Sequence, residues 1–246
     1  MFSSMIWLTG IVLEFLLLAR SLQTRLIGRY PFFYTYSGAV LLMAILLLFP
    51  DLYRRWYWST QFFTLLLGYG ILLEILNHAL APYPGAERFA RITGLVAFGL
   101  IMSFVVIFPI IRSRWSVTST MQDLERDFRT VQAVFILGLA TVISYYRIGL
   151  GRNMKGMISG YGLYIGTSLI SLALGSYSAN LFRGASRVFR PVTFDISLII
   201  WVVALWSYSP DPAPAPGICL EEDYEAFVAR TRTAMRSYLR TATRRR

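Results

Sequence analysis

Five polar side chains that could do chemistry lie within long apolar stretches of this sequence. Glu74, Asn77 and His78 follow one another at i, i+3 and i+4, which places them on one face of a helix. Glu74 and His78 can therefore hydrogen-bond directly, and such a pair can carry a proton or sense pH because histidine titrates near neutrality. Glu14 and Asp195 are the other two, and Glu14 can share a polar pocket with Glu74. Ionisable groups are costly inside a membrane, so each is a functional candidate.

A structural role for the same residues is the competing interpretation. Glu74 and His78 can form a buried polar clamp that fixes helix packing, or His78 can simply reach the lipid headgroups. Asp195 lies near the start of its apolar stretch, whereas Glu14 lies about two thirds along its own. We therefore expect these carboxylates at different depths, and their depths alone predict no continuous proton path.

The composition defines the class of protein in which these residues must be positioned. Of 246 residues, 56% are hydrophobic, 15% are aromatic and 15% are charged. Soluble domains carry about a quarter charged residues, and disordered chains are poor in apolar and aromatic residues. The composition therefore excludes both classes and indicates an integral membrane protein.

The rare residue types narrow the chemistry further. The chain has one cysteine (Cys219), one histidine (His78) and one lysine (Lys155). These counts exclude an intramolecular disulfide, an iron–sulfur cluster, a cysteine-based zinc site and bis-histidine haem ligation. Phosphate-binding loops and the common hydrolase motifs are missing from the sequence. We expect no catalytic site, no metal and no cofactor, and we expect the arginines to meet lipid phosphates rather than nucleic acid.

The apolar stretches predict an all-α fold, a polytopic transmembrane bundle of about seven spans over residues 1–208. A helical span needs about 20 mostly apolar residues. The first stretch has no basic residue before it, so we expect a retained helix rather than a signal peptide. The predicted spans are 4–19, 31–50, 57–77, 92–111, 130–147, 158–181 and 192–208.

The basic residues predict the orientation of the bundle. With the N-terminus outside, the cytoplasmic segments hold fifteen Arg and Lys residues and the external loops hold nine, Arg129 among them. Basic residues favour the cytoplasmic side. The split predicts a multi-pass protein of the bacterial cytoplasmic (inner) membrane, with its N-terminus outside and its C-terminus inside.

Small residues in the sixth span predict close helix packing or an oligomer contact. Gly162 and Gly166 form one small-x-x-x-small pattern, and Ser171 and Gly175 form another. Such patterns allow helix backbones to approach closely.

The end of the chain divides into a linker and an amphipathic helix. Residues 209–217 alternate proline with other residues, which favours a stiff, extended linker. Residues 218–246 predict a basic helix, with acidic residues in its first turns and arginines in its later turns. It can dock on an anionic membrane surface, on the protein's own cytoplasmic face or on a partner. The docking face consists of Leu220, Tyr224, Phe227, Val228, Met235, Tyr238 and Leu239.

Three local strings carry a resemblance to known proteins. They are Arg29-Tyr-Pro-Phe-Phe-Tyr-Thr-Tyr36, Glu74 and His78 followed by Pro82-Tyr-Pro84, and Leu124-Glu-Arg-Asp-Phe-Arg-Thr-Val-Gln132. In these strings the chain resembles a group of uncharacterised bacterial seven-helix integral membrane proteins. Its layout is loosely similar to the seven-helix sensor domains of bacterial histidine kinases. The resemblance implies a seven-helix membrane fold and no established activity.

Three functional hypotheses follow. The first is a non-catalytic receptor-like module, or an accessory subunit of a larger membrane complex. The second is a small-solute or proton-coupled transporter that uses Glu14, Glu74 and His78. The third is a lipid-modifying enzyme in which Glu74 is the base and His78 orients it. The expected partners are the lipid bilayer and either other membrane subunits or further copies of the chain.

Overall fold

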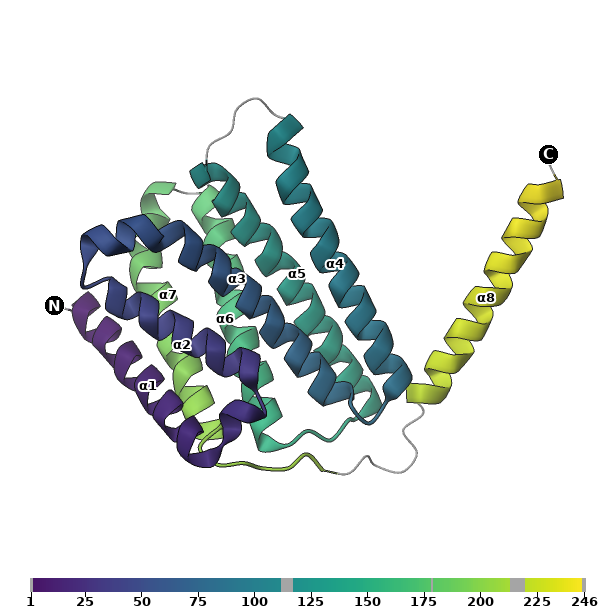
Figure 1. The fold of residues 1–246 in the computed structure, drawn as a ribbon, viewed down its shortest axis with the longest axis horizontal. Coiled ribbons are helices and arrows are strands. Elements are labelled where there is room, and N and C mark those ends of the chain that lie inside the picture. The colour runs from purple at the N-terminus through teal and green to yellow at the C-terminus, as the bar shows by residue number, and fades with distance from the viewer. Residues whose placement is uncertain (1, 112–116, 178, 213–219, 245–246) are drawn as a thin grey trace.

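The predicted all-α class is confirmed by the computed structural model, which describes residues 2–111, 117–177, 179–212 and 220–244. It leaves out the side chains of 2–4, 58, 101–102, 104–111, 117–124, 172–177, 179–188, 235 and 237–244. The described residues form helices and no strand (Figure 1). The helices are α1 (Phe2–Thr24), the 3₁₀ turn η1 (Leu26–Gly28), α2 (Pro31–Leu46), α3 (Pro50–Leu80), α4 (Pro84–Ile111), α5 (Val117–Tyr146), α6 (Arg152–Tyr177), α7 (Ala179–Ala204) and α8 (Leu220–Arg244).

The predicted apolar stretches overlap α1–α7, but their bounds differ from those of the helices, and the sixth, 158–181, runs past the end of α6 at Tyr177. The second stretch is broken, because α2 ends at Leu46 and α3 begins at Pro50. The seventh is longer than expected, because α7 continues through Pro191 instead of beginning after it. Within the described residues, three helices contain stretches long and apolar enough to cross a membrane: Met5–Thr24, Ser59–Leu80 and Glu125–Tyr146.

Successive helices run up and down the bundle. The connections at residues 25–30, 81–83 and 147–151 lie at the same end, where α7 also ends (Figure 1). Short connections of this kind join antiparallel neighbours. α7 packs against both α6 and α1, so the last helix of the bundle lies beside the first.

Aromatic side chains from different helices form the core. Phe33 of α2 and Trp201 of α7 meet edge to face, with ring centroids 5.1 Å apart. Tyr161 of α6 donates a 2.5 Å hydrogen bond to the backbone oxygen of Gly68 on α3. The outside of the bundle is also apolar: α1 exposes a stripe at the helical period, made of Met5, Leu8, Val12 and Phe15.

Candidate functional site

Glu74 caps a neighbouring helix. Its side chain reaches from α3 to the start of α2, where its carboxylate accepts backbone hydrogen bonds from Phe32 (3.1 Å) and Phe33 (3.0 Å). α2 begins with Pro31, and Tyr30 before it supplies no side-chain cap. The first N–H groups of a helix have no partner within the helix, and a carboxylate there is also favoured by the helix dipole. The Glu74 residue is 5% exposed, so this interaction is buried.

His78 and Asn77 do not form the predicted polar constellation with Glu74. The prediction of a direct hydrogen bond between the Glu74 and His78 side chains is wrong, because the Glu74 carboxylate instead binds the start of α2. His78 Nδ1 lies 2.9 Å from the backbone oxygen of Glu74, and its ring lies 5.1 Å from the ring of Tyr30. Burial, with a smaller contribution from the charge of Asp211, raises the pKa of Tyr30 to about 12. The buried Oδ1 of Asn77 has no hydrogen-bond partner among the described residues.

Two further helices at the same end of the bundle are capped by distant carboxylates. Glu221 of α8 accepts a 2.7 Å hydrogen bond from the backbone N–H of Gly85, at the second residue of α4. Asp211 accepts a 2.7 Å bond from the N–H of Gly151, directly before α6. The starts of α2, α4 and α6 therefore each bind a carboxylate from elsewhere in the chain. Two of the three carboxylates come from the segment after α7.

The segment after α7 is fastened to the bundle by more than Asp211. The N–H of Ser209 donates to Oδ1 of Asn153 at 2.7 Å, and Arg152 donates to the backbone oxygen of Ser207 at 3.0 Å. The guanidinium of Arg29 lies 3.7 Å from the ring centroid of Tyr208. The predicted linker thus begins as a bound segment at residues 209–212, and its residues 213–217 lie outside the described residues.

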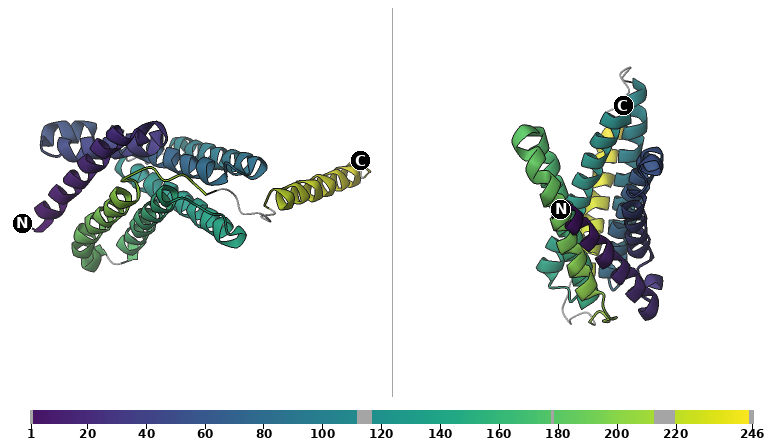
Figure 2. Two further views of the ribbon diagram at one scale, coloured as in Figure 1. Left: turned by 90° about the horizontal axis from the view of Figure 1, so that it is seen from below. Right: turned by 90° about the vertical axis from the view of Figure 1, so that its left-hand side faces the viewer.

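The predicted docking face of α8 contacts the bundle through its first turns. Leu220 is buried, and the rings of Tyr224 and Phe227 lie 6.0 and 6.5 Å from the ring of Phe89 on α4. Phe227 is nevertheless 56% exposed, and Val228 is half-buried. Beyond these turns α8 leads away from the bundle (Figure 2). An apolar groove of about 630 Å³ lies between α4, α5 and α8. The side chains of Met235, Tyr238 and Leu239 lie outside the described residues.

Glu14 lies opposite Asp195 rather than with Glu74. Glu14 is 2% exposed, and its Oε1 has no hydrogen-bond partner among the described residues. At the contact between α1 and α7, a Cβ built on Gly10, one turn before Glu14, would lie 3.0 Å from Oδ1 of Asp195. α7 begins at Ala179 and continues through Pro191, so Asp195 lies past the middle of this helix. Its depth in a membrane relative to Glu14 stays a prediction.

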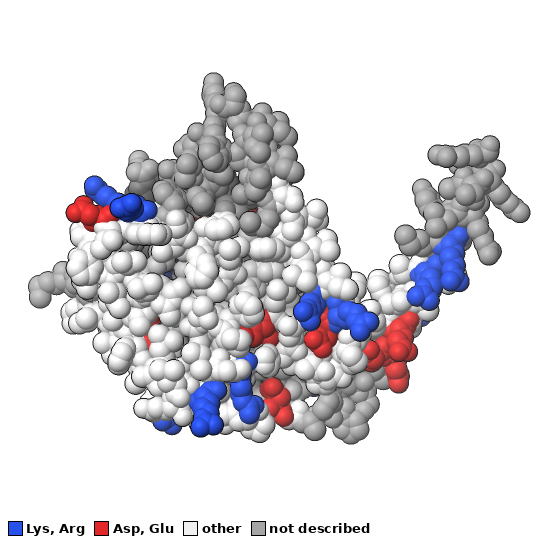
Figure 3. Space-filling model, viewed as in Figure 1, with Lys and Arg blue, Asp and Glu red and all other residues white. Residues whose placement is uncertain are grey.

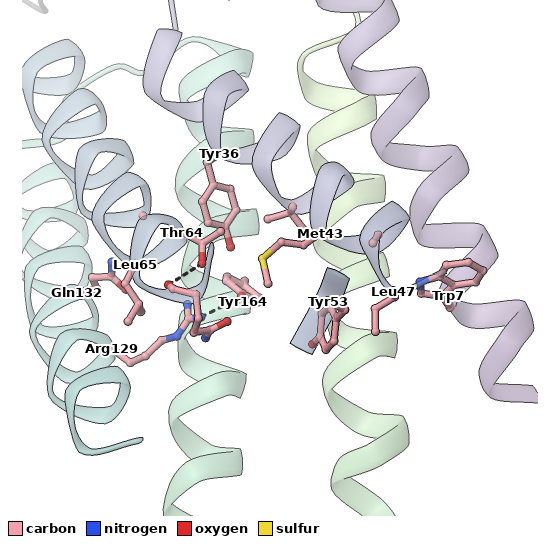
Figure 4. A pocket seen from close by; sticks show the side chains of 14 residues that line it. Trp7, Tyr36, Met43, Leu47, Tyr53, Thr64, Leu65, Arg129, Gln132 and Tyr164 are labelled. Atoms are coloured by element: carbon pink, nitrogen blue, oxygen red, sulfur yellow. Dashed lines mark hydrogen bonds between the residues drawn. The ribbon is translucent and has the colours of Figure 1, made fainter. Parts of the chain in front are cut away.

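An arginine that the sequence reasoning placed in an external loop is buried in the bundle. Arg129 of α5 is 7% exposed and lines a cavity of about 250 Å³ between α1, α2, α3, α5 and α6 (Figure 4). Its guanidinium donates a 2.9 Å hydrogen bond to the Tyr164 hydroxyl and lies 4.6 Å from that ring's centroid. It also lies 3.7 Å from Oε1 of Glu125. The loop assignment of Arg129 was therefore wrong.

The cavity contains polar atoms that the described residues do not satisfy. Nε of Arg129 and Oε1 of Gln132 are buried without a hydrogen-bond partner among them. Buried polar groups are normally paired, so such atoms mark a site where a ligand or water can bind. The sequence did carry a signal for these residues. Phe128, Arg129, Gln132, Ile136 and Leu139 recur with the period of one buried helix face.

The close helix contact in α6 lies one to two turns before the predicted glycines. A Cβ added to Gly156 would overlap Cβ of Ala204, and one on Gly160 would overlap the Trp201 ring. By contrast, a Cβ on Gly162 would make ordinary contact with Ile136, and one on Gly166 would meet no atom of the described residues within 4 Å. Gly162 and Gly166 therefore make no close helix contact with the described part of the chain, and the alternative, an oligomer contact, stays a prediction. Ser171 is buried, and the surroundings of Gly175 lie outside the described residues.

Comparison of the chain with protein-family models, curated proteins and solved structures finds no match.

Proposed function

We propose that the chain is a non-catalytic, receptor-like integral membrane protein. In this proposal α1–α7 cross a bacterial cytoplasmic membrane seven times, with the N-terminus outside and α8 in the cytoplasm. Support comes from the three long apolar helices and from the exposed apolar stripe of α1. The space-filling view adds a broad, largely uncharged surface, with most of the visible charged side chains near its edges and α8 (Figure 3). Such a surface suits contact with lipid tails.

The cavity around Arg129 is the observation that carries the receptor-like proposal. Its unpaired buried polar atoms are typical of a binding site, because small-molecule pockets combine apolar walls with a few placed polar groups. With the proposed orientation the cavity lies in the outer half of the membrane, and α8 lies at the opposite end of the bundle. Binding of a ligand in the cavity could therefore be transmitted across the membrane to α8.

α5 supplies a direct connection between the cavity and α8. Arg129 and Gln132 line the cavity near the middle of this helix. At its C-terminal end, Tyr146 donates a 2.9 Å hydrogen bond to Asp223 of α8. Tyr146 follows Arg129 by 17 positions, which correspond to about 25 Å of a continuous helix. A small displacement of α5 at the cavity would thus move Tyr146 and change its hydrogen bond with Asp223 of α8.

A small-solute or proton-coupled transporter is the second candidate. The neighbouring carboxylates Glu14 and Asp195 favour it, because paired ionisable groups within a membrane often mark an ion or proton path. The engagement of Glu74 with α2 removes one residue of the expected path. The same engagement weakens the lipid-modifying enzyme, in which Glu74 would have to be a free base.

Filling the cavity tests the receptor-like proposal without knowledge of the ligand. Ala44 lines the cavity, so Ala44→Trp places a permanent occupant there. Leu137→Trp is the matched control, since Leu137 is an exposed residue of α5. Hydrogen–deuterium exchange is measured on the amides of α8 in lipid nanodiscs. We expect Ala44→Trp to change exchange in residues 220–228 by at least threefold and Leu137→Trp to leave it unchanged. Equal exchange in wild type and both variants would contradict the proposal.

A further inference from the structure

We propose that the cavity around Arg129 binds the anionic group of an amphiphile, a carboxylate or phosphate carried on an apolar chain. This inference deepens the proposed receptor-like function and rests on it. The shared chemistry is the anion, which a free fatty acid or the headgroup of an anionic lipid can supply.

The charge balance at the cavity favours an anion. Glu125 is the carboxylate next to Arg129, but the same Oε1 also binds Arg190 at 3.5 Å. Two guanidinium groups thus share one carboxylate. The remaining contact of Arg129 is with the neutral Tyr164 hydroxyl, and its Nε has no partner among the described residues. A buried guanidinium is stabilised best by a carboxylate or phosphate, which can accept several of its N–H groups at once.

The walls of the cavity divide into a polar and an apolar side. Gln61, Thr64 and Gln132 line it on α3 and α5 together with Arg129 (Figure 4). Apolar side chains on α2 and directly after it also line the cavity, together with Tyr36 of α2: Val40, Met43, Ala44 and Leu47. The headgroup of an amphiphile would lie on the polar side and its chain against α2.

A second cavity gives the apolar chain somewhere to extend. It has a volume of about 490 Å³ and lies between α1, α2 and α7. Trp7, Ala44 and Leu47 line both cavities, so the two adjoin at these residues. The second cavity is mainly apolar, and its one acidic residue is Asp195, which would repel a second anion. A single anionic headgroup at Arg129 with its chain beyond Trp7 fits this arrangement.

The test compares octanoate with octanol, which has the same chain without the charge. Binding is measured by calorimetry on the full chain in phosphatidylcholine nanodiscs. The variants are Arg129→Gln and, as a matched control, Arg126→Gln, which removes an exposed arginine from the same helix. We expect octanoate to bind wild type and Arg126→Gln at least tenfold more tightly than octanol, and Arg129→Gln to lose this preference.

A second arm identifies the source of the anion. The midpoint of thermal unfolding is compared between phosphatidylglycerol and phosphatidylcholine nanodiscs. A rise in phosphatidylglycerol for wild type, absent in Arg129→Gln, assigns the site to a lipid headgroup. Octanoate preference without that rise assigns it to a free amphiphile. If wild type shows neither effect, or if Arg129→Gln retains them, the inference is overturned.

A second variant tests the inference if Arg129→Gln does not fold. Ala44→Trp then replaces it, because the larger side chain closes the junction between the two cavities, which Ala44 lines. Retention of the octanoate preference in Ala44→Trp would then overturn the inference. Failure of the proposed function is recognised separately. In that case α8 exchange is unchanged by Ala44→Trp, whatever octanoate does.

Discussion

The backbone N–H of Phe33 donates a 3.0 Å hydrogen bond to the carboxylate of Glu74, 41 residues later in the chain. This bond joins the start of α2 to the end of α3. The starts of α4 and α6 are bound in the same manner by Glu221 and Asp211. At one end of the bundle, the starts of three helices therefore each bind a carboxylate from another part of the chain.

Loss of the Glu74 charge should destabilise the bundle. Glu74→Gln leaves one acceptor oxygen and turns an amide N–H₂ towards the N–H groups of α2. A buried hydrogen bond to a charged group contributes about 1.5–3 kcal/mol, so we expect a loss of that order in the free energy of unfolding. Thermal unfolding in detergent measures it, with the exposed Glu222→Gln as control. Equal stability of the two variants would refute the capping role.

The close contact between α6 and α7 predicts an unusual pair of variants. Gly156→Ala should destabilise the bundle by about 1–3 kcal/mol, because its Cβ overlaps Cβ of Ala204. Adding Ala204→Gly should restore much of the loss by removing the second methyl group. Gly166→Ala is the control and should be neutral or stabilising by about 0.5–1 kcal/mol, since its Cβ meets no atom of the described residues within 4 Å. Thermal unfolding in detergent measures the stability of all three variants. A harmless Gly156→Ala would mean that α6 and α7 lie further apart.

A larger side chain at the start of α4 should release α8. A Cβ on Gly85 lies 2.6 Å from the Tyr224 ring, so Gly85→Leu cannot coexist with the present contact. We expect limited proteolysis after residue 212 to accelerate at least fivefold. Gly99→Leu on the same helix is the control, because a Cβ there meets no atom of the described residues within 4 Å. Unchanged cleavage in Gly85→Leu would show that α8 is held by other contacts.

The sequence predicted the helices well and the contacts between them poorly. Apolar stretches and the amphipathic period of α8 are local signals, so the helices follow from neighbouring residues. The partners of Glu74 and Asp195 depend on which helices pack together, and spacing within one helix cannot reveal this. Gly162 and Gly166 satisfy the small-residue pattern, yet Gly156 and Gly160 are the ones that face α7. Arg129 directly precedes the predicted fifth span, and its position in the sequence does not reveal that it lies on the buried face of α5.

The proposed orientation has its own test. The fifteen-to-nine split of Arg and Lys residues, which becomes fifteen to eight without the buried Arg129, predicts the C-terminus in the cytoplasm. A reporter fused to the C-terminus should therefore be active in the cytoplasm. A cysteine introduced at Trp56, in a Cys219→Ser background, should react with a membrane-impermeant label on intact cells. Labelling only after permeabilisation would reverse the orientation.

The central claim is that the cavity around Arg129 and the contact of α8 are coupled. The distance between spin labels on Arg88→Cys of α4 and Arg232→Cys of α8 tests it most directly. The measurement is made in nanodiscs, in a Cys219→Ser background, with and without Ala44→Trp. Ala44→Trp, which fills the cavity, should shift the distance distribution by several ångströms, and Leu137→Trp should leave it unchanged. Superimposable distributions in all three proteins would contradict it.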